Sequence, residues 1–279
     1  MSVINTNVSA LYSQNAMKIN ARAMSTAMEQ LSTGSRVNSA KDDAAGLAIG
    51  QDMTAQIRGL NQAVRNANDG INMMQTAEGA MVEQSNMLQR MRELAVQSSN
   101  GTYSSAQRGY LNTEFSKLIE QIDNIANQTT WNDQVLLNGT SNIGINGVSG
   151  QFDFQVGATS GQTISVTIAV MTTTEFGFSG LSVSTASGAS SAIATIGDAL
   201  DDINTQRAEI GAAVNQLAYA ADNLTNISAN VTTSRSSIMD TDYALATTQL
   251  AKTQIIQQAA TAMLAQANQQ AQGVLALLK

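Results

Sequence analysis

The sequence predicts a mainly α-helical fold: an elongated antiparallel coiled-coil bundle with a small β-hairpin region, in which the N- and C-terminal helices pair. Three observations predict this class. The chain has no proline in 279 residues, and because proline removes an amide donor and clashes with the preceding turn, its absence suits long helices. Apolar residues recur at alternating steps of four and three over much of the chain, as in a coiled coil. Only 4% of the residues are aromatic, which favours thin helical packing over a wide globule.

The first half of the chain predicts two helices that fold back on each other. An apolar stripe over four heptads begins at Met53, and its helix, which would be about 60 Å long, stops at the sequence SSNG at 98–101. A second helix should begin near Ser104, because Ser104 and Gln107 have capping-box spacing. The short break between the helices forces an antiparallel hairpin. The two stripes consist of Met53, Ile57, Leu60, Val64, Ala67, Ile71, Met74 and Met81, with Glu78 as the one polar interruption, and of Leu111, Phe115, Leu118, Ile122 and Ile125.

A third and longest stripe predicts a helix that begins near Ser191 and continues past Val231. Only two of its positions are polar, Arg207 and Ser228. Since none of the three stripes can be buried alone, together they predict one bundle. The third stripe consists of Ile193, Ile196, Leu200, Ile203, Arg207, Ile210, Val214, Leu217, Ala221, Leu224, Ser228 and Val231.

Residues 129–190 change character. They are rich in Gly, Ser, Thr and Asn, and the segments QFDFQVG and TISVTIAV alternate between polar and apolar residues with a period of two. This pattern predicts short strands, and glycines between them mark the turns. We expect a small hairpin-rich cap at one end of the bundle.

Both chain ends carry heptad repeats. In the N-terminal repeat, Ala21 and Met28 supply a second apolar position of the heptad. The C-terminal repeat includes Ala260. An apolar stripe on a helix of about 35 residues exceeds the few hundred Å² that monomers usually expose. We expect the ends to pack against each other first and against neighbouring copies second, which leads from a bundle to a polymer. The predicted polymerisation core consists of Val3, Ala10, Met17, Met24, Leu31, Ile256, Met263, Ala267, Val274 and Leu277.

The composition narrows the function. The chain has no cysteine and no histidine, which excludes disulfides, thiolate metal sites, imidazole bases and Ser-His-Asp triads. A net charge of −7 argues against a nucleic-acid surface. The N-terminus lacks the basic and apolar regions of a signal peptide, and no stretch of about 20 apolar residues could span a membrane. Carboxylate, Lys or Tyr chemistry remain as the only enzymatic routes. We expect a structural role without catalysis, with no cofactor, no nucleic-acid partner and no membrane insertion.

The adjacent Asp42 and Asp43 could suggest paired carboxylates for acid-base chemistry. Neighbouring residues on a helix point about 100° apart and do not share a proton. The interpretation we prefer is a junction between two layers of structure, with salt bridges to Lys41 or Arg36 across subunits.

A second acidic group, Asp198 with Asp201 and Asp202, could form a metal cluster but lacks the glycine and terminal glutamate of a calcium loop. We expect these carboxylates in the first turns of the third helix, where the helix dipole favours them. The 13 methionines fall mainly on the stripes, which predicts core packing, with adaptable packing between filament states as a sharper hypothesis.

Several long segments resemble bacterial flagellin. They are VNSAKDDAAGLAI at 37–49, NANDGINMMQTAEGAM at 66–81, LQRMRELAVQSSNG at 88–101 and the tail QANQQAQGVLALLK. The resemblance covers nearly the whole chain, from INTNVSAL near the start to DTDYALATTQLAKTQIIQQAATAMLAQAN near the end. Segments of this length are far more specific than a short motif.

The resemblance implies a secreted, extracellular subunit of the bacterial flagellum filament. Such a subunit is exported through the flagellar type III channel, with an export chaperone and a filament cap as partners. It also implies that residues 1–44 plus 240–279 form an inner core of paired terminal helices and that residues 45–239 form the next shell. Large outer domains are absent in this short form. The alternative is a hook-filament junction (hook-associated) protein, which shares both terminal regions.

A further implication concerns LQRMRELAVQ. In the family this stretch is what the innate receptor Toll-like receptor 5 recognises on monomers, and it also contributes to subunit packing. By motif match the residues in this chain are Gln89, Arg90, Glu93 and Leu94, with Glu114 on the adjacent helix. We expect the charged side chains of Arg90 and Glu114 to surround Leu94 as an apolar anchor, an arrangement common in protein interfaces.

Overall fold

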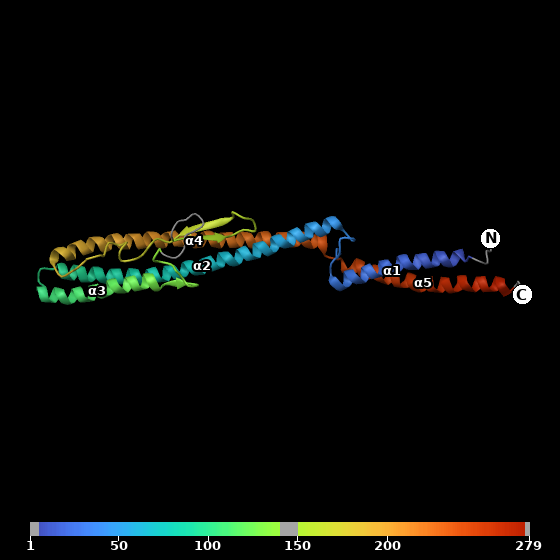
Figure 1. Ribbon diagram of the computed structural model, residues 1–279, viewed down its shortest axis with the longest axis horizontal. Coiled ribbons are helices and arrows are strands. Elements are labelled where there is room, and N and C mark those ends of the chain that lie inside the picture. Colours follow the sequence, from blue (N-terminus) through green and yellow to red (C-terminus); the bar gives the residue numbers. More distant parts are fainter. Residues whose placement is uncertain (1–5, 140–149, 277–279) are drawn as a thin grey trace. The chain divides into compact units, whose positions relative to one another are not determined.

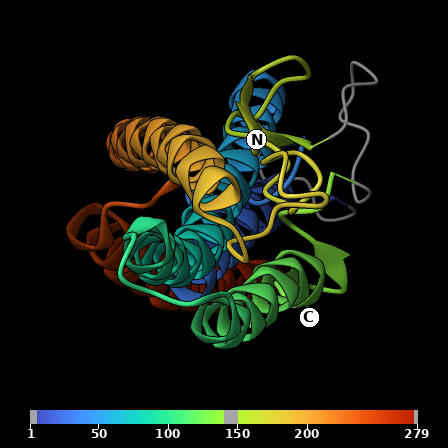
Figure 2. The ribbon, with the colours of Figure 1, turned by 90° about the vertical axis from the view of Figure 1, so that its left-hand side faces the viewer.

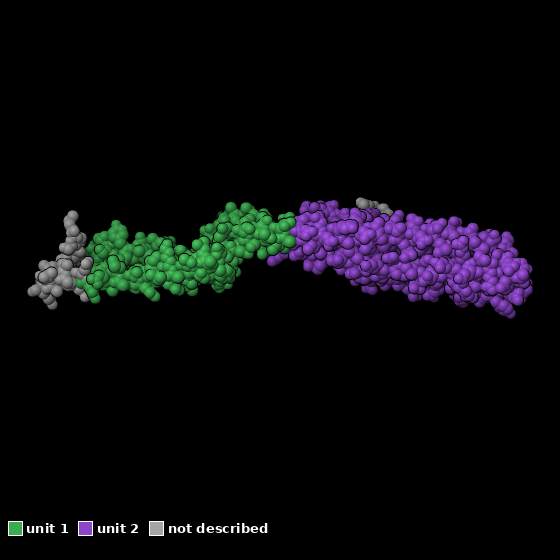
Figure 3. Space-filling view, turned by 180° about the vertical axis from the view of Figure 1, so that it is seen from behind, with its two compact units in different colours: residues 1–57, 229–279 green, residues 58–228 purple. Residues whose placement is uncertain are grey.

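The computed structural model describes residues 6–139 and 150–276. The chain divides into two compact units, a terminal unit of residues 1–57 with 229–279 and a bundle unit of residues 58–228 (Figure 3). The mainly α-helical class is confirmed. The described residues form five helices, α1 Val8–Thr33, α2 Ala44–Ser99, α3 Ser105–Gln128, α4 Ala186–Met239 and α5 Tyr243–Ala276, and four short strands, β1 Thr130–Trp131, β2 Gln134–Val135, β3 Gln151–Gln155 and β4 Thr163–Thr167.

The bundle unit contains α3 and most of α2 and α4, which lie side by side (Figures 1 and 2). The predicted stripes of these helices are buried or half-buried, as a shared core requires. The large side chains in this core that are completely buried include Met74, Met81, Leu88, Met91, Phe115, Ile122 and Ile196.

The start of α3 agrees with its sequence signal. The Ser104 hydroxyl accepts a hydrogen bond from the Gln107 amide at 3.3 Å, and the Gln107 side chain accepts one from the Ser104 amide at 2.9 Å. These reciprocal bonds satisfy two amide donors that a helix start leaves free. Because α2 ends at Ser99, only a short connection separates the two helices.

The start of α4 differs from the prediction. The helix begins at Ala186 rather than near Ser191. The Thr185 hydroxyl accepts a hydrogen bond from the Gly188 amide at 3.1 Å and so caps the helix. The serine- and threonine-rich sequence before Ser191 offers several possible caps, and the sequence alone did not choose among them.

The two predicted strands form a hairpin. β3 and β4 pair antiparallel, with Phe152 opposite Val166 and Phe154 opposite Ile164. Phe152 and Val166 are buried in the main core. On the other face of the hairpin, the Ser165 hydroxyl donates a hydrogen bond to the Asp153 carboxylate across the two strands. The period-two pattern is therefore confirmed as a strand pair with one buried face.

The expected position of the hairpin region, a cap at one end of the bundle, is wrong. Residues 151–183 run along α2 and α4, and glutamine side chains bind their backbone. Gln206 of α4 donates to the Thr167 carbonyl at 3.0 Å and accepts from the Ala169 amide at 3.2 Å. Gln84 of α2 donates to the Met171 carbonyl at 3.0 Å.

Small residues let the hairpin approach. A Cβ atom at Gly70 of α2 would lie 2.9 Å from the Phe154 ring, so the absence of a side chain there makes room for the hairpin. A strand pair with one apolar face needs a long surface to cover that face. The side of the bundle provides such a surface.

The terminal unit contains the antiparallel pair of α1 and α5. The Asn7 side chain donates to the Ala267 carbonyl at 3.0 Å, and the Asn20 side chain donates to the Thr253 carbonyl at 2.8 Å. Cα atoms of the two helices repeatedly come within 8 Å of each other, which is rare among the helices of the bundle unit. Small side chains at the interface, such as Ala27 and Ala246, allow this approach. The predicted pairing of the terminal helices is confirmed.

The second set of apolar positions in the N-terminal repeat was predicted at Ala21 and Met28, but the buried positions lie one residue earlier. Asn20 and Ala27 are buried in the interface, whereas Ala21 is exposed and 53% of Met28 is exposed. The prediction preferred the more apolar residue at each step. A buried amide with partners and a small alanine fit the close pair better than methionine does.

Candidate functional site

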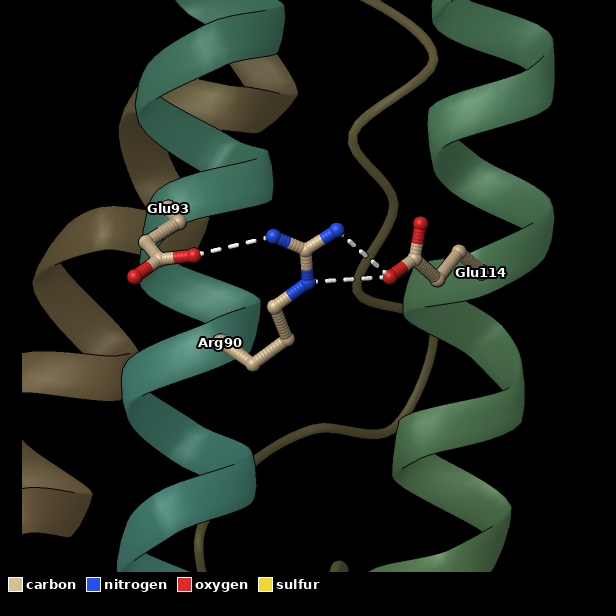
Figure 4. Close-up of polar contacts among 3 residues, drawn as sticks. All are labelled: Arg90, Glu93 and Glu114. Atoms are coloured by element: carbon tan, nitrogen blue, oxygen red, sulfur yellow. Dashed lines mark hydrogen bonds and ion pairs between the residues drawn. The ribbon is translucent and has the colours of Figure 1, made fainter.

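An exposed charged cluster joins α2 and α3. Arg90 Nη1 lies 2.9 Å from Glu93 Oε2, while Arg90 Nε and Nη2 both lie 2.9 Å from Glu114 Oε1 (Figure 4). Glu93 is one turn after Arg90 on α2, and Glu114 extends from α3. Hydrogen bonds to Glu93 first and to Glu114 second raise the pKa of Arg90 above its already high value. The guanidinium is therefore held charged and in a defined orientation.

Four of the five residues predicted for receptor recognition lie at the surface here. Gln89, Arg90, Glu93 and Glu114 are exposed. Leu94, expected as an apolar anchor beside them, is instead completely buried. Its place three residues after the buried Met91 could have indicated this, because residues three apart share a helix face.

A shallow groove next to the cluster was not predicted from the sequence. It lies between α2 and α4, and its most apolar exposed side chain is Val96, of which 52% is exposed. The sequence indicated this groove only weakly, since Val96 lies outside the apolar stripe of α2. The groove is lined by Gln89, Arg92, Glu93, Val96, Gln97 and Leu200.

The second candidate site is the outer surface of the terminal unit. Large apolar side chains there are open to solvent, among them Leu245 at 71% exposed, Ile255 at 66% and Leu11 at 56%. Exposed apolar surface of this kind marks an interaction site. Among the side chains that the structure describes on α1 and α5, the exposed large apolar ones are Val8, Leu11, Tyr12, Ile19, Met28, Tyr243, Leu245, Ile255, Ile256 and Met263.

The residues of the predicted polymerisation core fall into three groups. Half-buried positions are Ala10, Met17, Met24, Leu31 and Ala267. Ile256, 40% exposed, and Met263, 63% exposed, lie outside the buried face of α5. Val274 belongs to α5 but its side chain is outside the description, and Val3 and Leu277 lie outside the described residues.

The face of α5 that packs against α1 is therefore not the predicted one, although it shares Ala260 and Ala267 with it. Its buried and half-buried members are Ala246, Leu250, Thr253, Gln257, Ala260, Leu264 and Ala267. The prediction placed the more apolar residues inside the pair. The structure places smaller and more polar residues there and leaves Ile256 and Met263 outside.

The adjacent carboxylates Asp42 and Asp43 cap local structure. Asp42 Oδ2 accepts from the Ser39 amide at 3.0 Å and from the Ser39 hydroxyl at 2.8 Å. The hydroxyl bond is the main cause of a lowered pKa at Asp42. Asp43 Oδ1 accepts from the Gly46 amide at 2.8 Å, in the first turn of α2. Each carboxylate thus has its own partners, unlike a pair that shares a proton.

The other acidic group lies deeper in its helix than expected. Because α4 begins at Ala186, Asp198, Asp201 and Asp202 come after its first three turns, and the helix-start interpretation is wrong. Over residues 6–139 and 150–276, no three His, Cys, Asp or Glu side chains are grouped so that they could hold a metal ion. Within the same ranges, no helix combines the length and hydropathy that crossing a membrane requires.

Known proteins match the chain along its length. The family model described as the bacterial flagellin N-terminal helical region matches residues 4–142, and that of the C-terminal helical region matches residues 193–278. A flagellin of Halalkalibacterium halodurans is 43% identical over 279 residues, covering 99% of this chain and 100% of the relative. The flagellar filament 30.7 kDa core protein of Treponema maltophilum is 40% identical over 285 residues, covering 99% of each chain.

Solved structures agree with this. The crystal structure of Bacillus cereus flagellin matches with a TM-score of 0.50 and 28% identity, covering 60% of this chain and 94% of that one. A Vibrio parahaemolyticus protein described as hook-associated matches with a TM-score of 0.60 over 71% of this chain and 100% of that one, but at 16% identity it shows the fold alone. Since the two family models together match most of the chain and the relatives match its full length, the chain belongs to the bacterial flagellin family.

Proposed function

We propose that this chain is a structural subunit that self-assembles into the helical bacterial flagellar filament for swimming motility, with no catalytic role. The observation that carries the proposal is the apolar outer surface of α1 and α5, with Leu245, Ile255 and Met263 each more than 60% exposed. Burying one such side chain completely contributes about 1.5–3 kcal/mol. A helical polymer of identical chains buries this surface in every subunit.

The proposal includes an inner core and a surrounding shell. Residues 1–44 and 240–279 form the inner core of paired helices, and residues 45–239 form the next shell. The breaks in the helices at 34–43 and 240–242 support a boundary there. The chain then acts outside the cell as part of the flagellum, after export through the flagellar type III channel with a chaperone, and is added beneath a filament cap.

The hook-filament junction alternative is less well supported. The relatives that match at about 40% identity over the whole chain are named as flagellins or filament core proteins. The hook-associated likeness rests on fold alone.

The first test removes apolar contacts without shortening the chain. The variant Ile255→Ser with Met263→Ser should keep its helical content by circular dichroism but lose polymerisation, measured by sedimentation and negative-stain microscopy. The matched control, Gln254→Ser with Gln266→Ser, changes two exposed polar positions on the same helix and should polymerise normally. Normal filaments from the Ile255 and Met263 variant would contradict the proposal.

A second test removes residues 262–279. The truncated chain should retain a folded bundle unit, because the main core lies entirely within α2, α3, α4 and the segment between α3 and α4. It should no longer polymerise. Filaments formed by the truncated chain in a sedimentation assay would exclude an essential role for the C-terminal helix.

We also propose that Toll-like receptor 5 recognises the monomer through the charged cluster. Gln89, Arg90, Glu93 and Glu114 match the family stretch by residue type, and their exposure supports this role. The neighbouring groove, with Val96 at its surface, provides the apolar contact that the buried Leu94 cannot. Leu94 then supports the cluster from below.

A further inference from the structure

A polar layer lies inside the interface of α1 and α5. Asn20 is only 7% exposed, and its side-chain amide donates to the Thr253 carbonyl at 2.8 Å and to Gln257 Oε1 at 3.2 Å. Thr253 is 2% exposed, and its hydroxyl donates back to the Leu250 carbonyl of its own helix at 2.8 Å. The layer is thus buried and its hydrogen bonds are made.

A second asparagine repeats the contact near the start of α1. Asn7 caps the helix, since its Oδ1 accepts from the Ala10 amide at 3.1 Å, and its amide donates to the Ala267 carbonyl at 3.0 Å. The two asparagines are about two heptads apart, as are the two carbonyls they reach. Only Asn20 is buried, and only Asn20 also binds a side chain of α5.

The apolar side chains of the α5 face do not distinguish one heptad register from the next. Its members on α5 alternate between small residues and leucines, as in Ala246, Leu250, Ala260 and Leu264. If α5 slid by one heptad in either direction, Asn20 would face Ala246 and Leu250 or Ala260 and Leu264. In both cases a backbone carbonyl, of Ala246 or Ala260, would replace that of Thr253, but the Gln257 contact would be lost and the rest of the amide would lie against apolar side chains.

We propose that Asn20 is the specificity-determining residue that sets the register of α1 against α5. A buried polar residue in a coiled coil selects the register that satisfies all its hydrogen bonds, and here the bond from Asn20 to Gln257 exists in one register alone. The penalty for an unsatisfied buried amide falls on the wrong registers alone. This selectivity matters for a chain that presents two heptad helices to many identical copies, since other apolar helices are always available.

Contacts just beyond the end of the helix pair also bear on register. Ser35 and Asp240 form an isolated β-bridge, and the Thr241 amide donates to the Gly34 carbonyl at 3.0 Å. This bridge holds the two helices together at one end of the pair. Asn20 lies about four turns away, so the two contacts can be tested separately.

The test uses disulfide cross-linking of the full chain, which has no cysteine of its own. Counting along both helices from the Asn20–Thr253 bond brings Met24 opposite Leu250. Leu250→Cys is therefore combined in turn with Met17→Cys, Met24→Cys or Leu31→Cys, which report the register of the structure and the two registers one heptad away. Intramolecular disulfides are quantified by non-reducing gels and peptide mapping, so the readout does not require polymerisation.

With Asn20 present, the Met24→Cys pair should dominate. Asn20→Leu should raise the cross-linking of the Met17→Cys or Leu31→Cys pair several-fold. Ser13→Leu is the matched control, because Ser13 is half-buried at the same heptad position one repeat earlier, and it should leave the Met24→Cys pair dominant. A variant that moves the amide, Asn20→Leu with Ala27→Asn, should shift the preference to the Leu31→Cys pair.

Two results would overturn the proposal. If both Asn20 variants cross-link only through Met24→Cys, the bridge at Ser35 and Asp240 sets the register without Asn20. If no pair cross-links in the chain that retains Asn20, α1 and α5 do not pair as described. Circular dichroism of every variant separates a change of register from a loss of helix.

Discussion

Arg207 Nη2 lies 3.5 Å from Glu78 Oε1. These residues are polar interruptions of two different apolar stripes, one on α4 and one on α2. Both side chains are partly open to solvent, at 35% and 40% exposed. The other interruption of the α4 stripe is also paired, because the Ser228 hydroxyl donates to Asn61 Oδ1 of α2 at 3.0 Å. Both polar interruptions of the α4 stripe therefore have partners on α2, which is consistent with one alignment of the two helices.

Replacing one member of the Glu78–Arg207 pair should cost more than replacing both. Glu78→Leu leaves the Arg207 charge half-buried without its partner, whereas the double variant Glu78→Leu with Arg207→Leu completes the apolar stripe. Because both groups are more than a third exposed, their coupling should be under about 1 kcal/mol. Urea unfolding of the four chains of a double-mutant cycle measures it. A double variant less stable than either single one would refute this account.

Gln206 should be important for holding the strand segment on α4. Gln206→Ala removes the partners of the Thr167 carbonyl and the Ala169 amide at once, and because these bonds are only partly buried, each should contribute about 0.5–1.5 kcal/mol. Hydrogen exchange at Ala169 should become faster, and urea unfolding should show the lost stability. Gln216→Ala is the control, since Gln216 is exposed on the same helix and should have little effect. Unchanged protection at Ala169 would show that the bond is dispensable.

Receptor activation should depend on Arg90. Arg90→Ala removes a charged group, and charge-assisted hydrogen bonds contribute about 1.5–3 kcal/mol, so the monomer concentration for half-maximal activation of Toll-like receptor 5 in reporter cells should rise about tenfold or more. Lys117→Ala removes another exposed cation, which pairs with Glu120 at 2.7 Å on α3, and should change little. Equal activity of all three chains would argue against the charged cluster as the recognition site.

Asp42 should contribute stability that depends on pH. Its pKa is lowered in the folded chain, chiefly by the Ser39 hydroxyl, so the folded state binds the proton less readily than the unfolded state. The contribution is then present above the usual aspartate pKa of about 3.9 and is lost as the pH falls through the lower folded value. NMR titration should show the pKa of Asp42 rising toward its usual value in Ser39→Ala. An unchanged titration curve would assign the shift to another cause.

Much of the fold could be predicted because the helix signals are local. The capping box at Ser104 and the stop near Ser99 bound their helices by bonds within a few residues. The alternating segments at 151–155 and 163–167 predicted a strand pair for the same reason. The start of α4 was predicted less well, since Ser and Thr occur at many positions before it and each could cap a helix.

The candidate sites depended more on tertiary structure. The charge and polarity of Gln89, Arg90, Glu93 and Glu114 predicted exposure, and they are exposed. The burial of Leu94 and the outward position of Ile256 and Met263 follow from which neighbour each helix face meets. Periodicity identifies an apolar face but does not identify the surface that covers it.

By itself the sequence determined that this chain is built from long helices with apolar stripes, a short strand pair and two heptad ends, because proline content, heptad spacing and capping residues act over a few turns. Only the tertiary structure decided which faces of α1 and α5 meet, that Asn20 lies between them, and that Glu78 pairs with Arg207. The physical reason is that an apolar side chain can be buried against many partners and in many registers, because the hydrophobic effect is not directional. A buried hydrogen bond or an ion pair, in contrast, requires its two groups at one separation.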